Sequence, residues 1–415
     1  MYFEVIFVTI YQKMSITRDI TIKARGYLDD DDILLFVGAR QAGKTTILKQ
    51  LASYLEQKNE YVNFLNLEDP DYRQILNQSP KNLFKIYSLD IKKRNFIFID
   101  EVQYLNDPSN FLKYFYDQYG RKIKLLVSGS SAFYIDRKFR DSLAGRKRIF
   151  YVKTLSFREF LRFKNENDLS QADFRNIGIA DTEKTAIYFY EYMIYGGYPR
   201  VVLSTVDEKS EMLAEIAYSY IKKDLYEASI KQDEVFFKLF KILSTQTGNL
   251  VNSSELAHTL GVSKTAIDNY LYIMQKSFHI ALVRPFYRNI RKELTKMPKA
   301  FFLDTGLRNF FTSNFKVFEL REDKGALLEN AVFRQLLERY VMDEIRFWRT
   351  TQGHEIDFVV SDKEAFEVKV RRSGFREGHY SSFYKHYPEV AFNVVSMETG
   401  EQDMGKISFL TPWQL

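Results

Sequence analysis

The chain has 415 residues, a net charge of +6 and no cysteine. Its length suggests about two to four domains, and a hydrophobic share of 45% is enough for several buried cores. The lack of cysteine excludes disulfides and thiolate metal sites, and it is typical of a reducing cell interior or of a hot one. The mild basic excess permits nucleic-acid binding without indicating it.

The first residues do not have the pattern of a leader or an anchor. Residues 2–11 are apolar but contain Glu4, lack a basic start and a small-residue cleavage site, and are too short to span a bilayer. Met14 is an alternative start, which would make residues 1–13 an extension. Residues 15–30 are interpreted as an approach helix and turn. We therefore expect a soluble, cytoplasmic protein without a membrane segment.

Residues 38–46 match the phosphate-binding loop pattern G-x-x-x-x-G-K-[ST]. A buried strand is predicted just before this loop and a helix just after it, which is the context that the motif requires; a chance glycine turn is the alternative. Lys44 would place its charge between the β- and γ-phosphates, and Thr45 would offer its hydroxyl to Mg²⁺. The candidate nucleotide-binding residues are Gly38, Ala39, Arg40, Gln41, Ala42, Gly43, Lys44, Thr45 and Thr46.

An acidic pair follows another predicted buried strand, residues 95–99. Ligands of such sheets bind at the carboxyl ends of the strands. There Asp100 would reach Mg²⁺ through its water shell, and Glu101 would orient or deprotonate the attacking water. An ordinary acidic turn is the alternative, and the position of the pair after the loop argues against it. ATP and Mg²⁺ are the expected cofactors.

Two further segments of the same predicted sheet contain candidate catalytic residues. The strand predicted over residues 124–131 ends in hydroxyls, so Ser128 or Ser130 is the candidate sensor of the γ-phosphate; a serine-rich turn is an equal alternative. Arg146 is the candidate arginine finger, preferred over Arg148, and would reach the γ-phosphate of a neighbouring subunit. Solvated basic residues are the alternative.

From residue 156 the pattern becomes helical. Residues 156–161 open with a capping box, and long apolar-periodic helices continue to about residue 245. Residues 195–199 interrupt them with Gly-Gly and Pro, which break any helix. This interruption is either a plain turn between helices or a lid segment that packs on the nucleotide.

Residues 254–271 have a strong helix-turn-helix pattern, with Gly261 in the turn and Ser263 as the cap of the second helix. The outward-facing residues of that second helix would be Lys264, Thr265 and Asn269. Strands near residues 280–283 and 299–303 are interpreted as a wing. Its basic residues are Arg284, Arg288, Arg291, Lys292, Lys296 and Lys299. Phosphate contacts are one interpretation, and a winged helix that serves only as a lid is the other.

The carboxyl-terminal region follows a predicted linker at residues 311–324. Asp357 and then Glu367-x-Lys369 on a hairpin form the D-(x)n-E-x-K pattern of restriction-endonuclease-like folds. Two carboxylates would bind Mg²⁺, Lys369 would steady the attacking hydroxide, and Glu329 from the preceding helix would complete the site. An amphipathic hairpin with surface charges is one alternative, and a fold that binds without cutting is another.

Together these motifs resemble a family of archaeal and bacterial AAA-type ATP-binding proteins, in which a P-loop domain and helical lid precede a winged helix and an endonuclease-like domain of unknown function. The likeness rests on GARQAGKT, FIFIDEVQ, VSGSS, SLAGR, YGGYP, the helix-turn-helix, GALLEN, HEIDF and EVK. It implies that Pro199 and its neighbours contact adenine. It also implies a homo-oligomer, often a ring, in which Arg146 acts between subunits. Ser128 and Ser130 stand where the family pattern would allow a charged sensor.

The expected fold class is α/β, with a P-loop NTPase parallel sheet, an AAA/STAND-like helical lid, a winged helix-turn-helix and an endonuclease-like domain. The predicted boundaries are 1–30, 31–153, 154–240, 241–310 and 311–415. The first functional hypothesis is an ATP-hydrolysing machine that acts on DNA. The second is a nucleotide-switched oligomeric scaffold without nuclease activity. A small-molecule kinase is disfavoured, because no acceptor pocket motif is evident.

Overall fold

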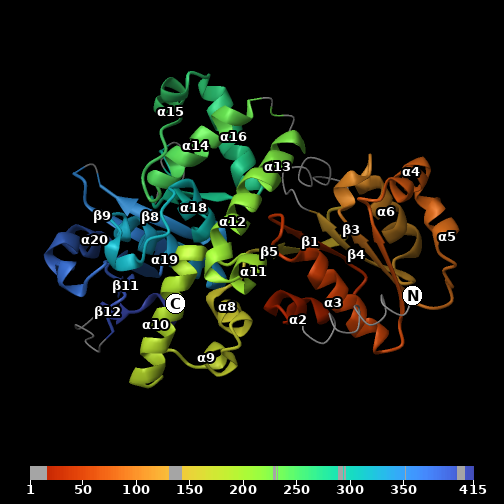
Figure 1. The fold of residues 1–415 in the computed structure, drawn as a ribbon, viewed down its shortest axis with the longest axis horizontal. Helices are drawn as coiled ribbons and strands as arrows, with labels where there is room; N and C mark the ends of the chain where they lie inside the picture. The colour runs from red at the N-terminus through yellow and green to blue at the C-terminus, as the bar shows by residue number, and fades with distance from the viewer. Residues whose placement is uncertain are drawn as a thin grey trace. The chain divides into compact units, whose positions relative to one another are not determined.

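The computed structural model describes residues 16–129, 143–227, 230, 232–287, 293, 296–350, 352–399 and 407–415. Met14, Ser130 and three residues of the expected basic wing, Arg288, Arg291 and Lys292, lie outside the described residues. The chain divides into two compact units, Met1–Lys153 and Thr154–Leu415 (Figure 1).

The first unit is built on a parallel sheet with the strand order β2-β3-β4-β1-β5. Its strands are β1 (Ile33–Gly38), β2 (Tyr61–Asn66), β3 (Asn95–Asp100), β4 (Ile123–Gly129) and β5 (Lys147–Val152). Its helices are α2 (Asp19–Arg25), α3 (Lys44–Glu56), α4 (Pro70–Gln78), η1 (Pro80–Asn82), α5 (Leu83–Ile86), η2 (Val102–Tyr104) and α6 (Pro108–Tyr119). All five strands coincide with predicted ones, which confirms the P-loop NTPase sheet.

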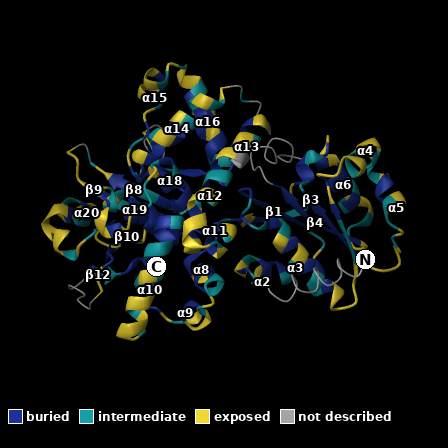
Figure 2. Ribbon diagram, in the orientation of Figure 1, coloured by how far each residue is buried: buried dark blue, intermediate teal, exposed yellow. Residues whose placement is uncertain are grey.

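The burial of the strands explains why their sequences are almost continuously apolar. β1, β3 and β4 are buried along their whole length (Figure 2), as expected when both faces of a parallel sheet are covered. Since the strands are parallel, their carboxyl ends lie at one edge of the sheet. The ends of β1, β3 and β4 therefore bring the phosphate-binding loop, the acidic pair and Ser128 together.

The second unit combines helices with a mixed seven-stranded sheet of order β12-β11-β10-β9-β8-β6-β7. The strands are β6 (Ile280–Pro285), β7 (Lys299–Phe302), β8 (Ile345–Arg349), β9 (Glu355–Val360), β10 (Glu364–Val368), β11 (Ala391–Val395) and β12 (Ile407–Leu410). The α-helices are α8 (Phe157–Phe163), α9 (Asn167–Gln171), α10 (Ile179–Tyr195), α11 (Pro199–Leu203), α12 (Val206–Glu215), α13 (Ile221–Glu227), α14 (Asp233–Thr245), α15 (Ser253–Leu260), α16 (Lys264–Lys276), α18 (Thr305–Phe311), α19 (Lys324–Arg339) and α20 (Ser381–His386). The short turns are the π-helix η3 (Ile216–Tyr220) and the 3₁₀-helices η4 (Phe318–Leu320), η5 (Met342–Glu344), η6 (Arg372–Gly374), η7 (Glu377–Tyr380) and η8 (Pro412–Gln414).

The two strands predicted as a wing belong to this sheet. β6 pairs with β7 in antiparallel fashion, and its end pairs in parallel with β8, where Arg284 lies opposite Arg346. A boundary at residue 310 between a winged helix and a separate carboxyl-terminal domain therefore does not correspond to a break in the sheet. The pairing joins segments about 60 residues apart, which local pattern does not reveal.

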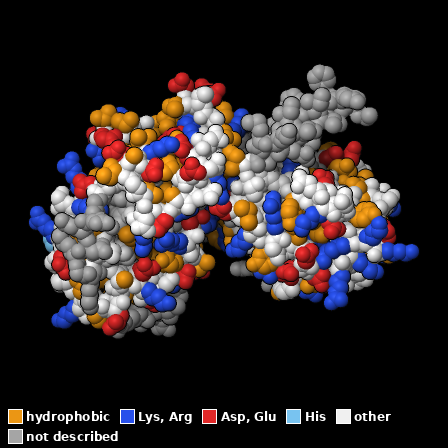
Figure 3. Space-filling model, turned by 90° about the horizontal axis from the view of Figure 1, so that it is seen from below, with side chains coloured by type: hydrophobic (Ala, Val, Ile, Leu, Met, Phe, Trp, Pro, Cys, Tyr) orange, Lys and Arg blue, Asp and Glu red, His pale blue; other side chains and the backbone are white. Residues whose placement is uncertain are grey.

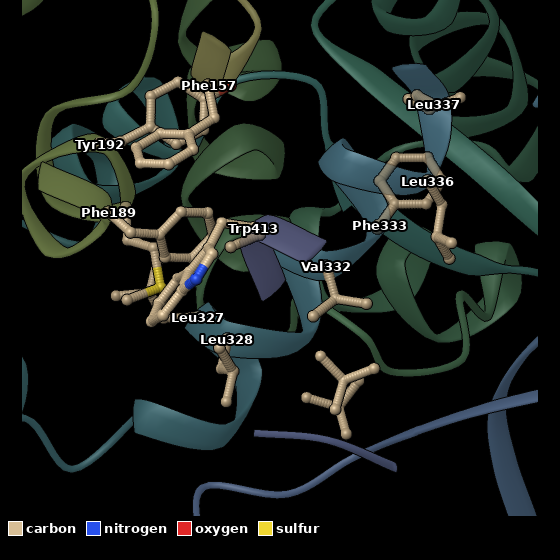
Figure 4. Close-up of a cluster of buried hydrophobic side chains, with 14 of the residues drawn as sticks. Phe157, Phe189, Tyr192, Leu327, Leu328, Val332, Phe333, Leu336, Leu337 and Trp413 are labelled. Atoms are coloured by element: carbon tan, nitrogen blue, oxygen red, sulfur yellow. The ribbon is translucent and has the colours of Figure 1, made fainter. Parts of the chain in front are cut away.

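One apolar core connects the helices that follow residue 154 with this sheet. Phe157 and Phe189 pack in the same cluster as Phe333 and Phe358, and Trp413 lies against Phe189 with ring centroids 5.6 Å apart (Figure 4). The predicted helical lid and the carboxyl-terminal region thus share their interior. A second cluster on the sheet includes Phe383 of α20.

The predicted linker at residues 311–324 is a packed segment. Arg321 is buried, and its Nε and Nη2 each donate to a different oxygen of Asp323 at 2.8 Å. Arg308 of α18 also donates to Asp323. The role of this segment as a linker between domains stays a prediction, and its end is held by these ion pairs. Among the described residues, no helix is both long enough and apolar enough to cross a membrane.

Candidate functional site

The phosphate-binding loop contains two glycines, Gly38 and Gly43, that are required for different structural reasons. A Cβ on Gly38 would lie 2.0 Å from the carbonyl oxygen of Val152 on β5, so no other residue fits there. Gly43 has φ 99°, a left-handed conformation, at the position that precedes α3. Because Gly43 has no side chain, it leaves the N–H groups of the helix start available to an anion.

Lys44 lies at the centre of this loop. Its Nζ is within hydrogen-bonding distance of two loop carbonyl oxygens, 3.1 Å from that of Gly38 and 2.9 Å from that of Ala39, and the residue is buried. Lys44 therefore holds a positive charge at the mouth of α3, where phosphate oxygens would be attracted both by the ammonium and by the helix dipole.

Asp100 ends β3 within reach of the loop. The hydroxyl of Thr45 donates to its Oδ2 at 2.7 Å, and the hydroxyl of Ser128 donates to Oδ1. Burial raises the pKa of Asp100, against the opposing effects of these two hydroxyls and of Lys44. A buried carboxylate supported mainly by neutral hydroxyls suits a divalent cation, so Thr45 and Asp100 fit the expected Mg²⁺.

Glu101 has an unusual backbone. Its φ and ψ are 59° and 49°, in the left-handed region that non-glycine residues seldom occupy. Its N–H donates to the hydroxyl oxygen of Ser128 at 3.1 Å, and Gln103 donates to its carboxylate. Such strain is concentrated at functional sites. Here the left-handed residue lies between the end of β3 and the start of η2.

Ser128 therefore links both acids of the pair, which is a different task from the one expected. As a sensor of the γ-phosphate it stays a prediction, and its contacts in this structure are with Asp100 and Glu101. The sequence pattern, a serine at the end of a buried strand, predicted the position of Ser128 but not its hydrogen-bond partners.

Sequence reasoning missed the support that Arg18 gives to the loop. This buried residue donates to the carbonyl oxygen of Ala42 at 2.9 Å and to that of Lys153 at 3.1 Å. It thus ties the phosphate-binding loop to the end of β5. An isolated arginine far before the motif carries no local signal for this role.

Arg146 lies at the opposite edge of the sheet from the loop. Its carbonyl oxygen accepts a hydrogen bond from Ile33 at the amino end of β1, and its Nε donates to Asp117 at 2.8 Å. Arg146 is therefore not placed to contact the phosphates of its own subunit. A role between subunits stays a prediction. The alternative, Arg148, pairs with Asp32 at 3.4 Å.

The Gly-Gly-Tyr-Pro turn has a structural task inside the second unit. The N–H of Gly197 donates to the buried carboxylate of Asp304 at 2.8 Å, and a Cβ on Gly196 would lie 2.1 Å from an Asp304 oxygen. Pro199 starts α11. These contacts explain both glycines without a ligand, and the contact of Pro199 with adenine stays a prediction.

The helix-turn-helix segment has the local geometry expected. Gly261 has φ 67° at the end of α15, and the hydroxyl of Ser263 accepts a hydrogen bond from Ala266 at 3.1 Å to cap α16. The three residues predicted to face outward are exposed; they are Lys264, Thr265 and Asn269. In the view of Figure 3, Lys and Arg side chains are interspersed with Asp and Glu.

Lys299 does not have the exposed position expected of a basic residue in the wing. It is buried, with 3% of its side chain exposed, and its Nζ lies 3.1 Å from Glu329. It also contacts Glu355. Lys299 therefore cannot make the phosphate contact predicted for it, because its ammonium is turned inward toward carboxylates.

The four predicted nuclease residues do come together. Asp357 on β9 lies one step beyond the Phe358–Phe366 pair, opposite Glu367 on β10. Oδ2 of Asp357 accepts a hydrogen bond from the N–H of Val368 at 2.7 Å. The remaining contacts join Lys369 to Glu367, Tyr380 to Glu367 at 2.8 Å, and Lys299 to Glu329. We call the set of Lys299, Glu329, Glu355, Asp357, Glu367 and Lys369 the carboxylate cluster.

The charges of the carboxylate cluster are strongly coupled. Burial and the charge of Asp357 raise the pKa of Glu329 to about 8 and that of Glu367 to about 7. Although burial acts against its charge, Glu329, Asp357 and Glu355 raise the pKa of Lys299. The side chains of this cluster therefore share an electrostatic environment in which the lysines remain charged.

The carboxylate cluster does not have the arrangement of a metal site. Among the residues that the structure describes, no group of three or more His, Asp or Glu side chains is arranged to hold a metal ion. Glu367 is 4% exposed, and its Oε2 has no hydrogen-bond partner among the described residues. As nuclease residues, Glu329, Asp357, Glu367 and Lys369 stay a prediction.

Three family models match successive parts of the chain. Residues 30–161 match the family model of an AAA domain. Residues 187–317 and 324–415 match two models described as domains of unknown function, DUF8612 and DUF4143.

Several relatives resemble most of the chain. An uncharacterized protein of Methanocaldococcus jannaschii is 29% identical over 85% of this chain and 77% of its own length. An uncharacterized protein of Haemophilus influenzae is 26% identical over 80% of each chain. Among solved structures, the ORC2 protein of Aeropyrum pernix in its ADP form is 12% identical with a TM-score of 0.35, covering 72% of this chain and 94% of that chain.

The sheet order, the loop, the acidic pair and the AAA match all concern the same part of the chain. The amino-terminal unit therefore has a P-loop NTPase fold and matches the family model of an AAA domain, and it is followed by regions that match domains of unknown function.

Proposed function

We propose that the amino-terminal unit hydrolyses ATP with Mg²⁺. The observation that carries this proposal is the arrangement at the end of β3, where Asp100 is held by Thr45 and Ser128 and is followed by a strained Glu101. A site that only bound nucleotide would need the loop and the cation ligand. It would not need a second acid in a strained conformation directly after Asp100.

In this mechanism each residue has a separate task. The N–H groups at the start of α3 and the ammonium of Lys44 bind the phosphates. Thr45 and Asp100 would hold Mg²⁺, which would neutralise charge on the phosphates. Glu101 orients the attacking water and accepts its proton. Gln103, through its hydrogen bond to Glu101, restricts the orientation of that carboxylate.

The finer proposal is that nucleotide state is coupled to DNA binding or processing by the second unit, within a homo-oligomer in which Arg146 acts between subunits. The exposed Lys264, Thr265 and Asn269 of α16 support a DNA contact. The buried Lys299 reduces the basic character of the expected wing. The alternative is a nucleotide-switched scaffold without nuclease activity, which is favoured by the lysine contacts of the carboxylate cluster.

ATP turnover tests both levels of the proposal. We expect phosphate release by the full chain with Mg²⁺ and none with excess EDTA; release that does not require a divalent cation would refute the ATPase proposal. Repeating the assay with duplex, single-stranded and branched DNA at low salt tests the coupling. If no DNA form changes the rate and none binds, the DNA proposal fails and the scaffold remains.

Incubation of labelled DNA with Mg²⁺ or Mn²⁺ separates the two roles of the second unit. Cutting that is lost in Lys369→Ala but kept in Lys44→Ala would exclude a scaffold without nuclease activity. Intact DNA under all conditions, with ATP-dependent change in oligomeric state, would support that scaffold.

A further inference from the structure

Lys299 is the least expected member of the carboxylate cluster. It comes from β7, the strand at the edge of the sheet, whereas the four predicted residues come from α19, β9 and the region of β10. Its Nζ lies 3.1 Å from Glu329 and contacts Glu355, and 3% of its side chain is exposed. The same ammonium lies 5.3 Å from the ring centroid of Phe347. Lys299 is thus enclosed by an aromatic ring and carboxylates.

The backbone around Lys299 is shaped to keep this contact. Gly248 has φ 81°, and a Cβ there would lie 2.7 Å from Oε2 of Glu329. The N–H of Gly248 also donates to the carbonyl oxygen of Ala300 at 2.9 Å, next to Lys299. A glycine at this position therefore gives the Glu329 carboxylate the room that it needs beside the lysine.

One carboxylate oxygen of the cluster lacks a partner among the described residues. Oε1 of Glu367 is contacted by Lys369 and by the hydroxyl of Tyr380, whereas its buried Oε2 has no partner among the described residues. Glu367 and Asp357 therefore retain acceptor capacity for a cation, but Glu329 and Glu355 already share an ammonium.

We propose that the buried ammonium of Lys299 keeps divalent metal ions out of the carboxylate cluster. A metal ion there would need oxygens of Glu329 as well as those of Asp357 and Glu367, and it would be repelled by an ammonium that cannot withdraw into solvent. This inference goes beyond the proposed function and concerns the second unit alone, so failure of the ATPase proposal would not affect it.

Mn²⁺ titration of the nucleotide-free full chain tests this inference. The parent for this experiment carries Asp100→Asn, so that the first unit contributes no carboxylate from β3. We expect no binding of Mn²⁺ to the cluster in this parent. Lys299→Met should bind one Mn²⁺ at least about tenfold more tightly, because a buried like charge is removed. Lys296→Met is the matched control, since Lys296 is an exposed lysine of the same region and its removal should change nothing.

Second-site variants identify where the ion binds. The gain in Lys299→Met should disappear when Glu329→Gln is added. The inference is overturned if the parent itself binds Mn²⁺ and Asp357→Asn removes that binding, or if folded Lys299→Met binds no more Mn²⁺ than the parent. Should Lys299→Met fail to fold, Lys299→Gln replaces it, and the parent titration with its Asp357→Asn partner still gives a decisive result.

Discussion

The two carboxylate sites of this chain differ in the groups that surround the carboxylates. In the first unit, the two oxygens of Asp100 accept hydrogen bonds from the hydroxyls of Thr45 and Ser128. In the second unit, Glu329 faces Lys299 and Glu367 faces Lys369. Both sites stand near the ends of buried strands, and both would look alike to a search for acids at strand ends.

The difference indicates what each site can accept. A buried carboxylate held by neutral hydroxyls keeps its negative charge for an external cation, at a cost in stability that shows as the raised pKa of Asp100. Carboxylates that contact lysines have a positive charge of the chain beside them, although burial and Asp357 still raise the pKa of Glu329 to about 8, so a further cation must compete with that charge. This comparison supports the proposals that the first site takes a metal–nucleotide complex and that the second does not.

The largest effect is expected for Lys44→Ala, which removes the cation that the first site does possess. ATP affinity should fall by about 100-fold or more, because charge-assisted hydrogen bonds to the phosphates are lost. Equilibrium binding of a fluorescent ATP analogue measures this effect. Lys49→Ala, on the following turn of the same helix, is the control and should bind as the parent does; equal affinity for Lys44→Ala would mean that the loop does not bind phosphate as described.

Asp323 offers a carboxylate with a purely structural task for comparison. Against the effect of burial, the hydrogen bond from Arg321 and the charge of Arg308 hold the pKa of Asp323 at about 2. Because this value lies below that of the unfolded chain, the stabilisation is present above pH 4 and is lost as the pH falls toward 2. Asp323→Asn should therefore destabilise the second unit by about 2 kcal/mol at pH 7.

Urea unfolding at several pH values measures the effect of Asp323→Asn. The difference from the parent should narrow as the pH is lowered from 4 toward 2. A difference that did not depend on pH over this range would show that the ion cluster is not the source of the stability.

Asp100→Asn should not lower the free energy of unfolding at pH 7, in contrast to Asp323→Asn. The pKa of Asp100 is raised by burial, so its contribution to stability is lost as the pH rises through the folded-state pKa. At pH 7 the variant should be at least as stable as the parent while losing ATP turnover. Thermal unfolding together with phosphate release measures both properties, and a clear loss of stability would show that Asp100 is a structural residue.

Two glycine variants test the position of Glu329 in the second site. Gly261→Ala should cost about 1 kcal/mol, because its left-handed φ is strained for alanine and the space beside it is open. Gly248→Ala should cost about 1–2 kcal/mol more, because its Cβ would also displace the Glu329 carboxylate. The difference in urea unfolding free energy reports that contact. Equal losses would contradict the position given to Glu329 beside Gly248.

The first site could be predicted from the sequence because its parts are local. The loop residues are contiguous, Asp100 directly follows a recognisable strand, and Ser128 ends another. Parallel pairing then places these strand ends at one edge without further information. The capping box of Ser156 and Glu159 was confirmed for the same reason, since both hydrogen bonds are local.

The second site could be predicted only in part. Asp357, Glu367 and Lys369 share a hairpin, so their meeting follows from strand alternation. Lys299 reaches Glu329 and Glu355 because β6 and β7 join the sheet through a pairing with β8, and nothing in the local pattern of residues 280–303 indicates that pairing. Its basic neighbours favoured an exposed wing, and burial reversed the interpretation. Arg18 was missed for the same reason.

ATP turnover and binding by Glu101→Gln test the central claim most directly. The variant keeps the loop, Lys44, Thr45 and Asp100, so it should bind ATP with Mg²⁺ as tightly as the parent. Its turnover should fall by about 100-fold or more, because glutamine cannot accept a proton from the attacking water. Hydrolysis by Glu101→Gln at the parental rate, with unchanged binding, would contradict the account of this site.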